Sequence, residues 1–389
     1  MAYRFAAVER ALRGAAPHEL LDAVRTALTE NFQAINVDLL MADYAMTILQ
    51  PVGVLPYTEE PVSVHTSAPG RAFGAQEPHI CAGDSPSTVT VHLPVTVRGD
   101  RLGVLSVTLP GDQPPQVLSV LEDIAEVLGH EIIVAERDTD LYLQARRAAR
   151  LTLAAEMQWQ LLPGRACSRP EYALGGQLEP AYAIHGDNFD WSASADHLTL
   201  TVTNGMGEGI EAALLTNLAV NALRNARRAG LALADQACLA DQALYGQYRG
   251  AAHLSTLLLR FHLVNGQVEI IDAGSPKIWR LREGVVEPIE LDAQLPLGMF
   301  EDTEYTAQQF HVVPGDRLLF VSDGVYDVVS PLGERYRERA LARAIRDTRL
   351  LPPSQVPRAV LQELAGYRGQ TPVDDDAMIV CLDWHGRQL

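Results

Sequence analysis

The spacing of apolar and polar residues changes twice along the chain and predicts three segments. Residues 1–114 begin with a helical pattern around "PHELLDAVRTALTENF" and continue with the apolar, β-rich run "VDLLMADYAMTILQPV". In "TVTVHLPVTVRGDRLGVLSVTLPG", residues 88–111, apolar and polar positions alternate, stop at "RGD" and then alternate again. This pattern predicts a hairpin with a tight turn inside an α+β module.

Residues 115–160 carry apolar side chains at steps of three and four, which predicts helix. One unbroken helix of this length would span about 65 to 70 Å, at about 1.5 Å per residue, which is too long for one globular face. We therefore expect a coiled-coil-like connector that pairs with a second copy in a homodimer. The imperfect heptads and the polar stretch "AERDTDLY" leave a second interpretation open, in which separate helices cap the two domains.

Residues 161–389 alternate between strand and helix patterns. Strand-like runs include "LTLTVT", "LSTLLLRFHLV", "RLLFVSDGV" and "AMIVCLDW", and helix-like runs include "IEAALLTNLAVNALRNARRA" and "PSQVPRAVLQELAGY". Strands at hairpin spacing with clustered helices predict antiparallel sheets covered by helices, so the whole chain is expected to be of the α+β class.

Composition narrows the function classes. The 389 residues suggest two domains, and 47% apolar with 21% charged residues is typical of a soluble globular protein. No apolar run reaches the roughly 18 residues of a membrane span, and "MAYRFAAVERALRG" has no signal-peptide pattern, so we expect a cytoplasmic protein without a membrane partner. The net charge of −18 disfavours nucleic acid as a partner. Cys81, Cys167, Cys238 and Cys381 form no CxxC motif, which fits a reducing compartment.

The stretch "LTLTVTNGMGEGIEAALL", residues 198–215, predicts a strand, a glycine-rich turn and a helix. Gly207, Gly209 and Ala212 match the GxGxxG/A pattern of dinucleotide-binding proteins. That motif should lead to a second parallel strand ending in an acidic residue, whereas "NARRAGLALADQACLADQAL" continues as helix. The pattern therefore disfavours a nicotinamide oxidoreductase.

Aspartates occur where several predicted strands begin or end. A single aspartate at such a place is most often a turn or cap residue. Mg²⁺ and Mn²⁺, however, take several oxygen ligands from rigid elements that converge on one point, so the whole set predicts a metal site. The set comprises Asp187, Asp190, Asp323, Asp374, Asp375 and Asp376.

Residues from about 155 to 384 resemble the PPM (PP2C-type) serine/threonine phosphatases of the bacterial SpoIIE and RsbU subgroup, and residues 1–114 resemble a GAF domain. The matching blocks follow the family's order: "AAEMQWQLLP", "PAYAIHGDNFDW", "NGMGEGIEAALL", "AGSPKI", "LPLGMF", "PGDRLLFVSDGVYD" and "DDAMIVCL". The resemblance implies an N-terminal GAF-like α/β sandwich, a helical connector and a C-terminal PP2C-like αββα sandwich. The expected boundaries are 1–114, 115–160 and 161–389.

The resemblance also implies a chemistry. In this family two divalent cations, Mn²⁺ or Mg²⁺, activate a water molecule that attacks the phosphorus of a phosphorylated serine or threonine. By resemblance, Asp187, Asp323 and Asp375 would be catalytic metal ligands, directly or through water, and the Gly205 carbonyl would add an oxygen. Asp190 and Asp376 are expected to orient bound water molecules.

The family's bridging aspartate aligns with Asn204. An amide offers one neutral oxygen and an NH₂ group that cannot bind a metal, so we expect one ion or weak binding. Three further departures point the same way: His185 replaces a glycine, Glu208 replaces a His or Lys, and Ser275 replaces a His.

Two functions follow from these residues. The first is a weak phosphatase acting on a phosphoprotein, such as a phosphorylated anti-sigma-factor antagonist, with a GAF module that binds a small-molecule ligand. The second is a pseudophosphatase that binds a regulatory protein partner without turnover. For residues 1–114, a dimerisation domain without ligand is the alternative. Cys81 beside His79 is the sole candidate there for attaching a bilin or haem.

Overall fold

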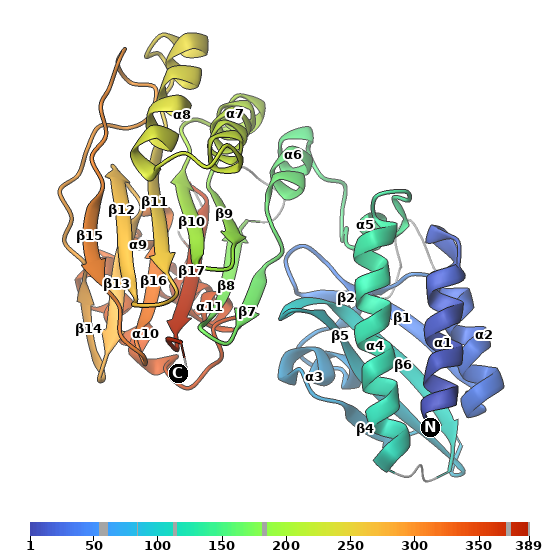
Figure 1. Cartoon of the computed structure of the whole chain (residues 1–389). Coiled ribbons are helices and arrows are strands. Elements are labelled where there is room, and N and C mark those ends of the chain that lie inside the picture. The colour runs from blue at the N-terminus through green and yellow to red at the C-terminus, as the bar shows by residue number, and fades with distance from the viewer. Residues whose placement is uncertain (54–60, 84, 112–114, 181–184, 371–374, 388–389) are drawn as a thin grey trace. The chain divides into compact units, whose positions relative to one another are not determined.

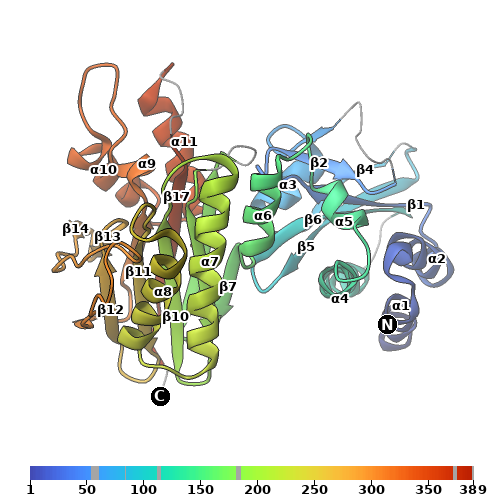
Figure 2. The ribbon, with the colours of Figure 1, turned by 90° about the horizontal axis from the view of Figure 1, so that it is seen from above.

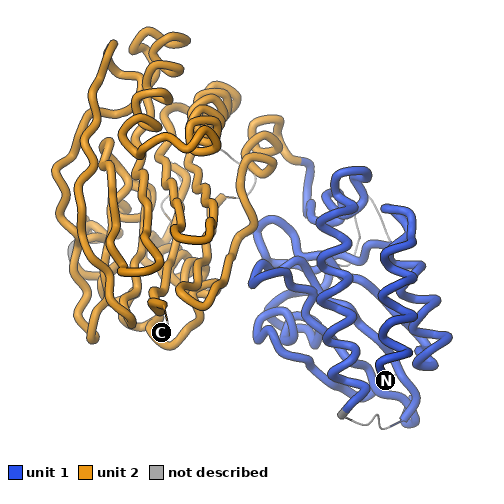
Figure 3. Tube along the Cα trace, viewed as in Figure 1, with its two compact units in different colours: residues 1–150 blue, residues 151–389 orange. Residues whose placement is uncertain are grey.

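The computed structural model describes residues 1–53, 61–83, 85–111, 115–180, 185–370 and 375–387. The chain divides into two compact units, Met1–Arg150 and Leu151–Leu389, which are shown in different colours in Figure 3. Each unit has its own sheets and hydrophobic core. In the described part, no helix has the length and apolar character needed to cross a membrane.

Unit 1 is built on one six-stranded antiparallel sheet with the order β3-β2-β1-β6-β5-β4. The strands are β1 Asn36–Ala42, β2 Ile48–Pro51, β3 Val62–Ser63, β4 His79–Ala82, β5 Thr88–Val97 and β6 Asp100–Pro110. The hairpin predicted at 88–111 is confirmed, because β5 pairs with β6 out to Val97 and Asp100. Arg98 and Gly99 between them have φ of 51° and 92°, which suits a tight hairpin turn.

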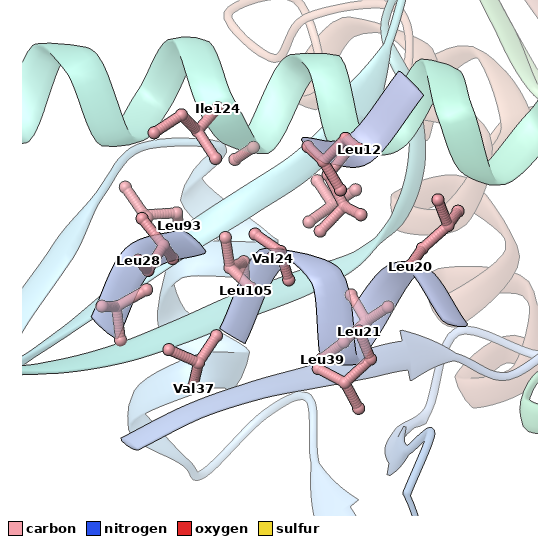
Figure 4. Close-up of a cluster of buried hydrophobic side chains, with 14 of the residues drawn as sticks. Leu12, Leu20, Leu21, Val24, Leu28, Val37, Leu39, Leu93, Leu105 and Ile124 are labelled. Carbon is pink, nitrogen blue, oxygen red and sulfur yellow. The ribbon is translucent and has the colours of Figure 1, made fainter. Parts of the chain in front are cut away.

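Helices cover both faces of this sheet. α1 Ala2–Gly14, α2 Leu20–Phe32 and α4 Pro115–Ala135 lie on one face, and α3 Ala68–Ala75 lies on the other (Figures 1 and 2). Figure 4 shows the core on the first face, where Val24 and Leu28 of α2 lie near Leu93, Leu105 and Ile124. Alternate residues of the central strands point into this core, as expected for a sheet with side chains of period two.

The segment predicted as a connector forms three helices instead of one. α4 ends at Ala135, α5 spans Leu141–Ala145, and α6 spans Leu153–Leu161. The apolar positions of α4, such as Leu121 and Leu128, are fully buried in the core of unit 1, whereas α6 belongs to unit 2. The periodicity of 115–135 therefore has a partner within the same chain. Pairing of two copies stays a prediction.

Unit 2 is a sandwich of two antiparallel sheets, ordered β15-β12-β11-β10-β9 and β14-β13-β16-β17-β8-β7. Its strands are β7 Ala166–Arg169, β8 Tyr172–Glu179, β9 Asn188–Ala193, β10 His197–Asn204, β11 Ser255–His262, β12 Gln267–Ala273, β13 Lys277–Arg282, β14 Val285–Pro288, β15 Gln308–His311, β16 Arg317–Val321 and β17 Ala377–Trp384.

Helices cover the outer faces of both sheets. α7 Gly209–Arg228 and α8 Leu233–Tyr248 pack on the first sheet, and α9 Asp323–Tyr326, α10 Ala340–Asp347 and α11 Val356–Arg368 lie beside the second. Figure 2 shows these layers as helices, strands, strands and helices. Leu200, Phe261, Phe320 and Val380 are among the side chains buried between the sheets. The predicted αββα architecture is confirmed.

Candidate active site

The two sheets bring the predicted aspartates to strand ends. Asp187 directly precedes β9 in the first sheet. In the second sheet, Asp323 follows β16, and Asp375 and Asp376 directly precede β17. Because β16 and β17 are antiparallel neighbours, with Val321 opposite Ile379, the end of one strand lies beside the start of the other. Asp374 lies outside the described residues.

Asp376 connects the two sheets at this point. Its Oδ2 accepts hydrogen bonds from three consecutive backbone N–H groups, those of His185 at 2.8 Å, Gly186 at 3.0 Å and Asp187 at 3.3 Å. The side chain has no exposed surface, and burial raises its pKa to about 6, against the lowering effect of the N–H groups. Asp376 thus holds the turn that presents Asp187.

The other aspartates repel one another. Burial raises the pKa of Asp187 well above its ordinary value, and the neighbouring Asp376, Asp375 and Asp323 raise it further. The pKa of Asp375 is raised by burial and then by Asp323. A positive charge among these four carboxyl groups would relieve both the repulsion and the cost of burial.

The residues fit a hard divalent cation in donor type and charge. Asp187 Oδ2 and Asp376 Oδ1 are buried and have no hydrogen-bond partner among the described residues, as oxygens awaiting a ligand would be. Carboxylate oxygens are the donors that Mg²⁺ and Mn²⁺ prefer. Across the described ranges, no three His, Cys, Asp or Glu side chains converge closely enough to form a ready metal-binding group.

The turn after β10 approaches Asp187 closely. A Cβ added to Gly205 would lie 2.4 Å from Gly186 backbone atoms, so only glycine permits this contact. Thr216 of α7 donates a hydrogen bond of 2.7 Å to the Gly186 carbonyl and holds the helix against the same turn. The predicted glycine turn is therefore part of the site.

Asn204, at the end of β10, points its amide into a different network. Its Nδ2 donates to Ser275 Oγ at 3.2 Å, and Ser275 Oγ lies 2.9 Å from the Tyr326 hydroxyl. Both replacements in the family pattern, Asn204 and Ser275, are thus bonded to each other. Neutral groups here occupy positions where the resemblance implies charged or basic ones.

Asp190 does not join the other aspartates in any contact of the described residues. Its carboxylate accepts hydrogen bonds from Arg224 at 2.8 Å and Arg227 at 2.9 Å, both on α7, and its side chain is only 4% exposed. The expected water-orienting role for Asp190 therefore has no support in the geometry. The carboxylate instead connects β9 to α7.

The remaining departures differ in position. His185 lies at the site, where its backbone N–H donates to Asp376 and its side chain lowers the pKa of Asp375 against the effect of burial. Glu208 is an exposed residue that precedes α7 and makes no side-chain cap. A compensating ligand role for Glu208 therefore gains no support.

Two residues of the site were missed at the sequence level. Ser322 is fully buried, donates to the Asp376 carbonyl at 3.4 Å and accepts from Met378 N at 3.0 Å, and its hydroxyl lowers the pKa of Asp187 against the effect of burial. Gln158 of α6 donates from Nε2 to the Asp187 carbonyl. The sequence did offer a clue to each residue, because Ser322 directly precedes Asp323 and Gln158 lies in the block "AAEMQWQLLP".

A two-sheet sandwich with aspartates gathered at its strand ends defines the class of PP2C-like phosphatase domains. Residues 194–385 match the family model described as Stage II sporulation protein E (SpoIIE). Residues 194–385 of the C-terminal unit therefore match a SpoIIE PP2C-type phosphatase domain. The α/β unit that precedes it is consistent with a regulatory domain.

Individual relatives agree at low identity. The chain is 21% identical over 214 residues to Phosphoserine phosphatase RsbU of Bacillus subtilis (strain 168), covering 54% of this chain and 64% of that protein. It is 22% identical over 256 residues to Protein IcfG of Synechocystis sp., and the match covers 58% of this chain and 40% of that protein. The chain thus spans less than two thirds of the length of either relative.

A solved structure supports the fold. The RsbU and RsbW domains of Rv1364c from Mycobacterium tuberculosis superpose with a TM-score of 0.50 at 21% identity, covering 57% of this chain and 62% of that one.

Proposed function

We propose that this protein is a metal-dependent serine/threonine protein phosphatase of the SpoIIE/RsbU type in bacterial signalling, with slow turnover. The observation that carries the proposal is the group of Asp187, Asp323, Asp375 and Asp376 at the strand ends of a SpoIIE-type domain, in which Asp187 and Asp376 are buried. Burial and neighbouring carboxylates raise the pKa of Asp187, Asp375 and Asp376. Strongly perturbed carboxyl groups of this kind are typical of functional sites.

Each residue has a proposed role. Asp187, Asp323 and Asp375, with the Gly205 carbonyl, would hold Mn²⁺ or Mg²⁺. Bound there, such an ion supplies an activated water molecule and neutralises charge on the phosphoryl oxygens. Asp376 orients the turn at residues 185–187 through its three N–H contacts, and the Ser322 hydroxyl holds the start of β17 through the backbone of Asp376 and Met378.

Slow turnover follows from Asn204. A carboxylate here would add one unit of negative charge and an anionic oxygen for each of two cations, whereas the amide adds neither. Its Nδ2 is also engaged by Ser275, which fixes the side chain in a neutral network.

Calorimetric titration of Mn²⁺ into the full chain, with turnover of a phosphoserine peptide measured in parallel, tests the proposal. We expect weak binding and slow turnover by the native protein, and tighter binding with at least about tenfold faster turnover after Asn204→Asp, the scale of one charge-assisted interaction. Asp187→Asn, made as a matched loss of one carboxylate, should abolish both. Equal turnover by Asp187→Asn and the native chain would refute the assigned site.

A pseudophosphatase is the second candidate, favoured by the neutral Asn204–Ser275 pair. It predicts no turnover by the native protein at any Mn²⁺ concentration, together with retained binding of a phosphoserine peptide. Turnover restored by Asn204→Asp alone would support it and identify the missing charge as the cause.

The proposal extends to regulation and partners. Unit 1 would act as a GAF-like sensor that binds a small molecule or as a dimerisation domain, in a cytoplasmic homodimer. The substrate would be a phosphorylated regulatory protein such as an anti-sigma-factor antagonist. Regulation would reach the site through α6, near the start of unit 2, because Gln158 of this helix donates a hydrogen bond to the Asp187 carbonyl. Sedimentation of the full chain tests the homodimer.

A further inference from the structure

A polar cluster lies on unit 1, on the sheet face opposite the core shown in Figure 4. His79 of β4 stands opposite His92 of β5, which stands opposite Ser106 of β6. Cys81 lies two residues after His79 and so shares its face of β4. Val91 and Leu105, the sequence neighbours of His92 and Ser106, point into the core instead.

The cluster has the geometry of a nucleophile, a base and an orienting group. Cys81 Sγ lies 3.6 Å from His92 Nε2, and His92 Nδ1 lies 2.8 Å from Ser106 Oγ. The ring of His79 stacks on that of His92 with centroids 6.4 Å apart. A base whose second nitrogen is held by a third group is the arrangement that activates side-chain nucleophiles.

Exposure fits the same roles. His92 is only 7% exposed, so its ring is held within the sheet surface. Cys81 is partly exposed on β4, which is an edge strand of the described sheet. Burial lowers the pKa of His92, and the neighbouring His79 lowers it further, which favours the neutral imidazole, the form that can accept a proton.

We propose that Cys81 is a reactive thiol and a site of covalent modification by hydroperoxides and small electrophiles, with His92 as its base and Ser106 as a positioning residue. The proposal is independent of any activity of unit 2.

The chemistry balances with a hydroperoxide as the named oxidant. The thiol proton passes to His92, and the thiolate attacks one peroxide oxygen, so an S–O bond forms while the O–O bond breaks. Sulfur is oxidised by two electrons to a sulfenic acid, and the leaving oxygen takes the proton from His92. With iodoacetamide, a C–S bond forms instead and iodide leaves.

Cys238 is an internal control of matched surroundings. Both Cys81 and Cys238 are partly exposed, and each sulfur lies 3.7 Å from a backbone carbonyl oxygen, that of Thr90 or Thr303. No contact with an imidazole occurs at Cys238 within the described residues. The two thiols therefore differ chiefly in the presence of His92.

The test uses iodoacetamide on the full chain at pH 7, with the alkylation rate of each cysteine followed by peptide mass spectrometry, and hydrogen peroxide with dimedone trapping in parallel. A free thiol is only a few per cent ionised at pH 7, so we expect Cys81 to react about tenfold faster than Cys238. The advantage should disappear in urea. Equal rates in the native protein would overturn the proposal without any variant.

Variants then separate the roles. His92→Gln should slow Cys81 to the rate of Cys238 and leave Cys238 unchanged, and unchanged calorimetric transitions would report that both units are folded. Ser106→Ala should slow Cys81 severalfold, and Ser106→Thr, which keeps the hydroxyl, should restore the rate. An unchanged Cys81 rate in folded His92→Gln protein would rule out His92 as the base.

Discussion

At the scale of single residues, the buried aspartates are a source of instability that the fold tolerates. A carboxyl group whose pKa is raised on folding holds its proton more strongly in the folded state. The free energy of unfolding therefore falls as the pH rises from the unfolded pKa, about 3.9, through the folded one. For Asp376 the fall is complete above its folded pKa of about 6. The metal-free protein at pH 7 thus bears the full cost.

Asp187→Asn should therefore raise the melting temperature of the metal-free protein at pH 7 by about 2–4 °C, corresponding to about 1 kcal/mol. The gain should shrink toward about pH 4, where the native carboxyl is protonated. Scanning calorimetry in EDTA measures both. Asp196→Asn is the control, since this exposed carboxyl has its pKa lowered by His197 and Ser194 and should give no gain. A lower melting temperature for Asp187→Asn would contradict the argument.

The sequence predicted site residues only where the residues that act together lie close to one another along the chain. The glycine turn and the aspartates beside strands carry their chemistry in short motifs. The pairing of Asp190 with Arg224 and Arg227, and that of Asn204 with Ser275, joins residues far apart in the chain. The first contact depends on the packing of α7 on its sheet, and the second on the order of the strands in that sheet; no local pattern encodes either one.

At the scale of elements, the hairpin of β5 and β6 was predictable because its turn and its alternation are local. The helix of 115–135 was predictable as helix, but its partner was not. An apolar stripe has the same period whether it packs on its own sheet or on a second chain, and α4 packs in the core of unit 1.

The ion pairs of Asp190 on β9 with Arg224 and Arg227 on α7 give a prediction at the scale of elements. Asp190→Ala leaves Arg224 and Arg227 without their buried carboxylate and should lower the free energy of unfolding by about 3–5 kcal/mol in urea titrations. Mn²⁺ affinity should be unchanged, because Asp190 is outside the proposed ligand set.

Asp327→Ala is the matched control, since Asp327 also pairs with two arginines, Arg335 and Arg337, but is 39% exposed. Its loss should cost less than about 1 kcal/mol. If folded Asp190→Ala protein lost Mn²⁺ binding, Asp190 would have to be counted among the residues of the metal site.

At the scale of the whole molecule, two units with separate cores should unfold in separate transitions. A ligand stabilises only the unit that binds it. Saturating Mn²⁺ is therefore expected to raise one calorimetric transition and leave the other in place.

Leu28→Ala identifies the second transition. Leu28 is fully buried in the core of unit 1, and its truncation should cost that unit about 2–5 kcal/mol. Only the transition that Mn²⁺ does not move should shift downward. One transition displaced by both changes would show that the units unfold together.

The contact of Asp376 with three successive N–H groups has a consequence for motion. Residues 185–187 belong to no strand, yet their amide hydrogens are held by a side chain of the opposite sheet. These hydrogens can exchange with solvent deuterium only when the start of β17 and the turn before β9 separate. We therefore expect them to exchange as slowly as strand amides, so that deuterium uptake at this loop records how often the sandwich opens.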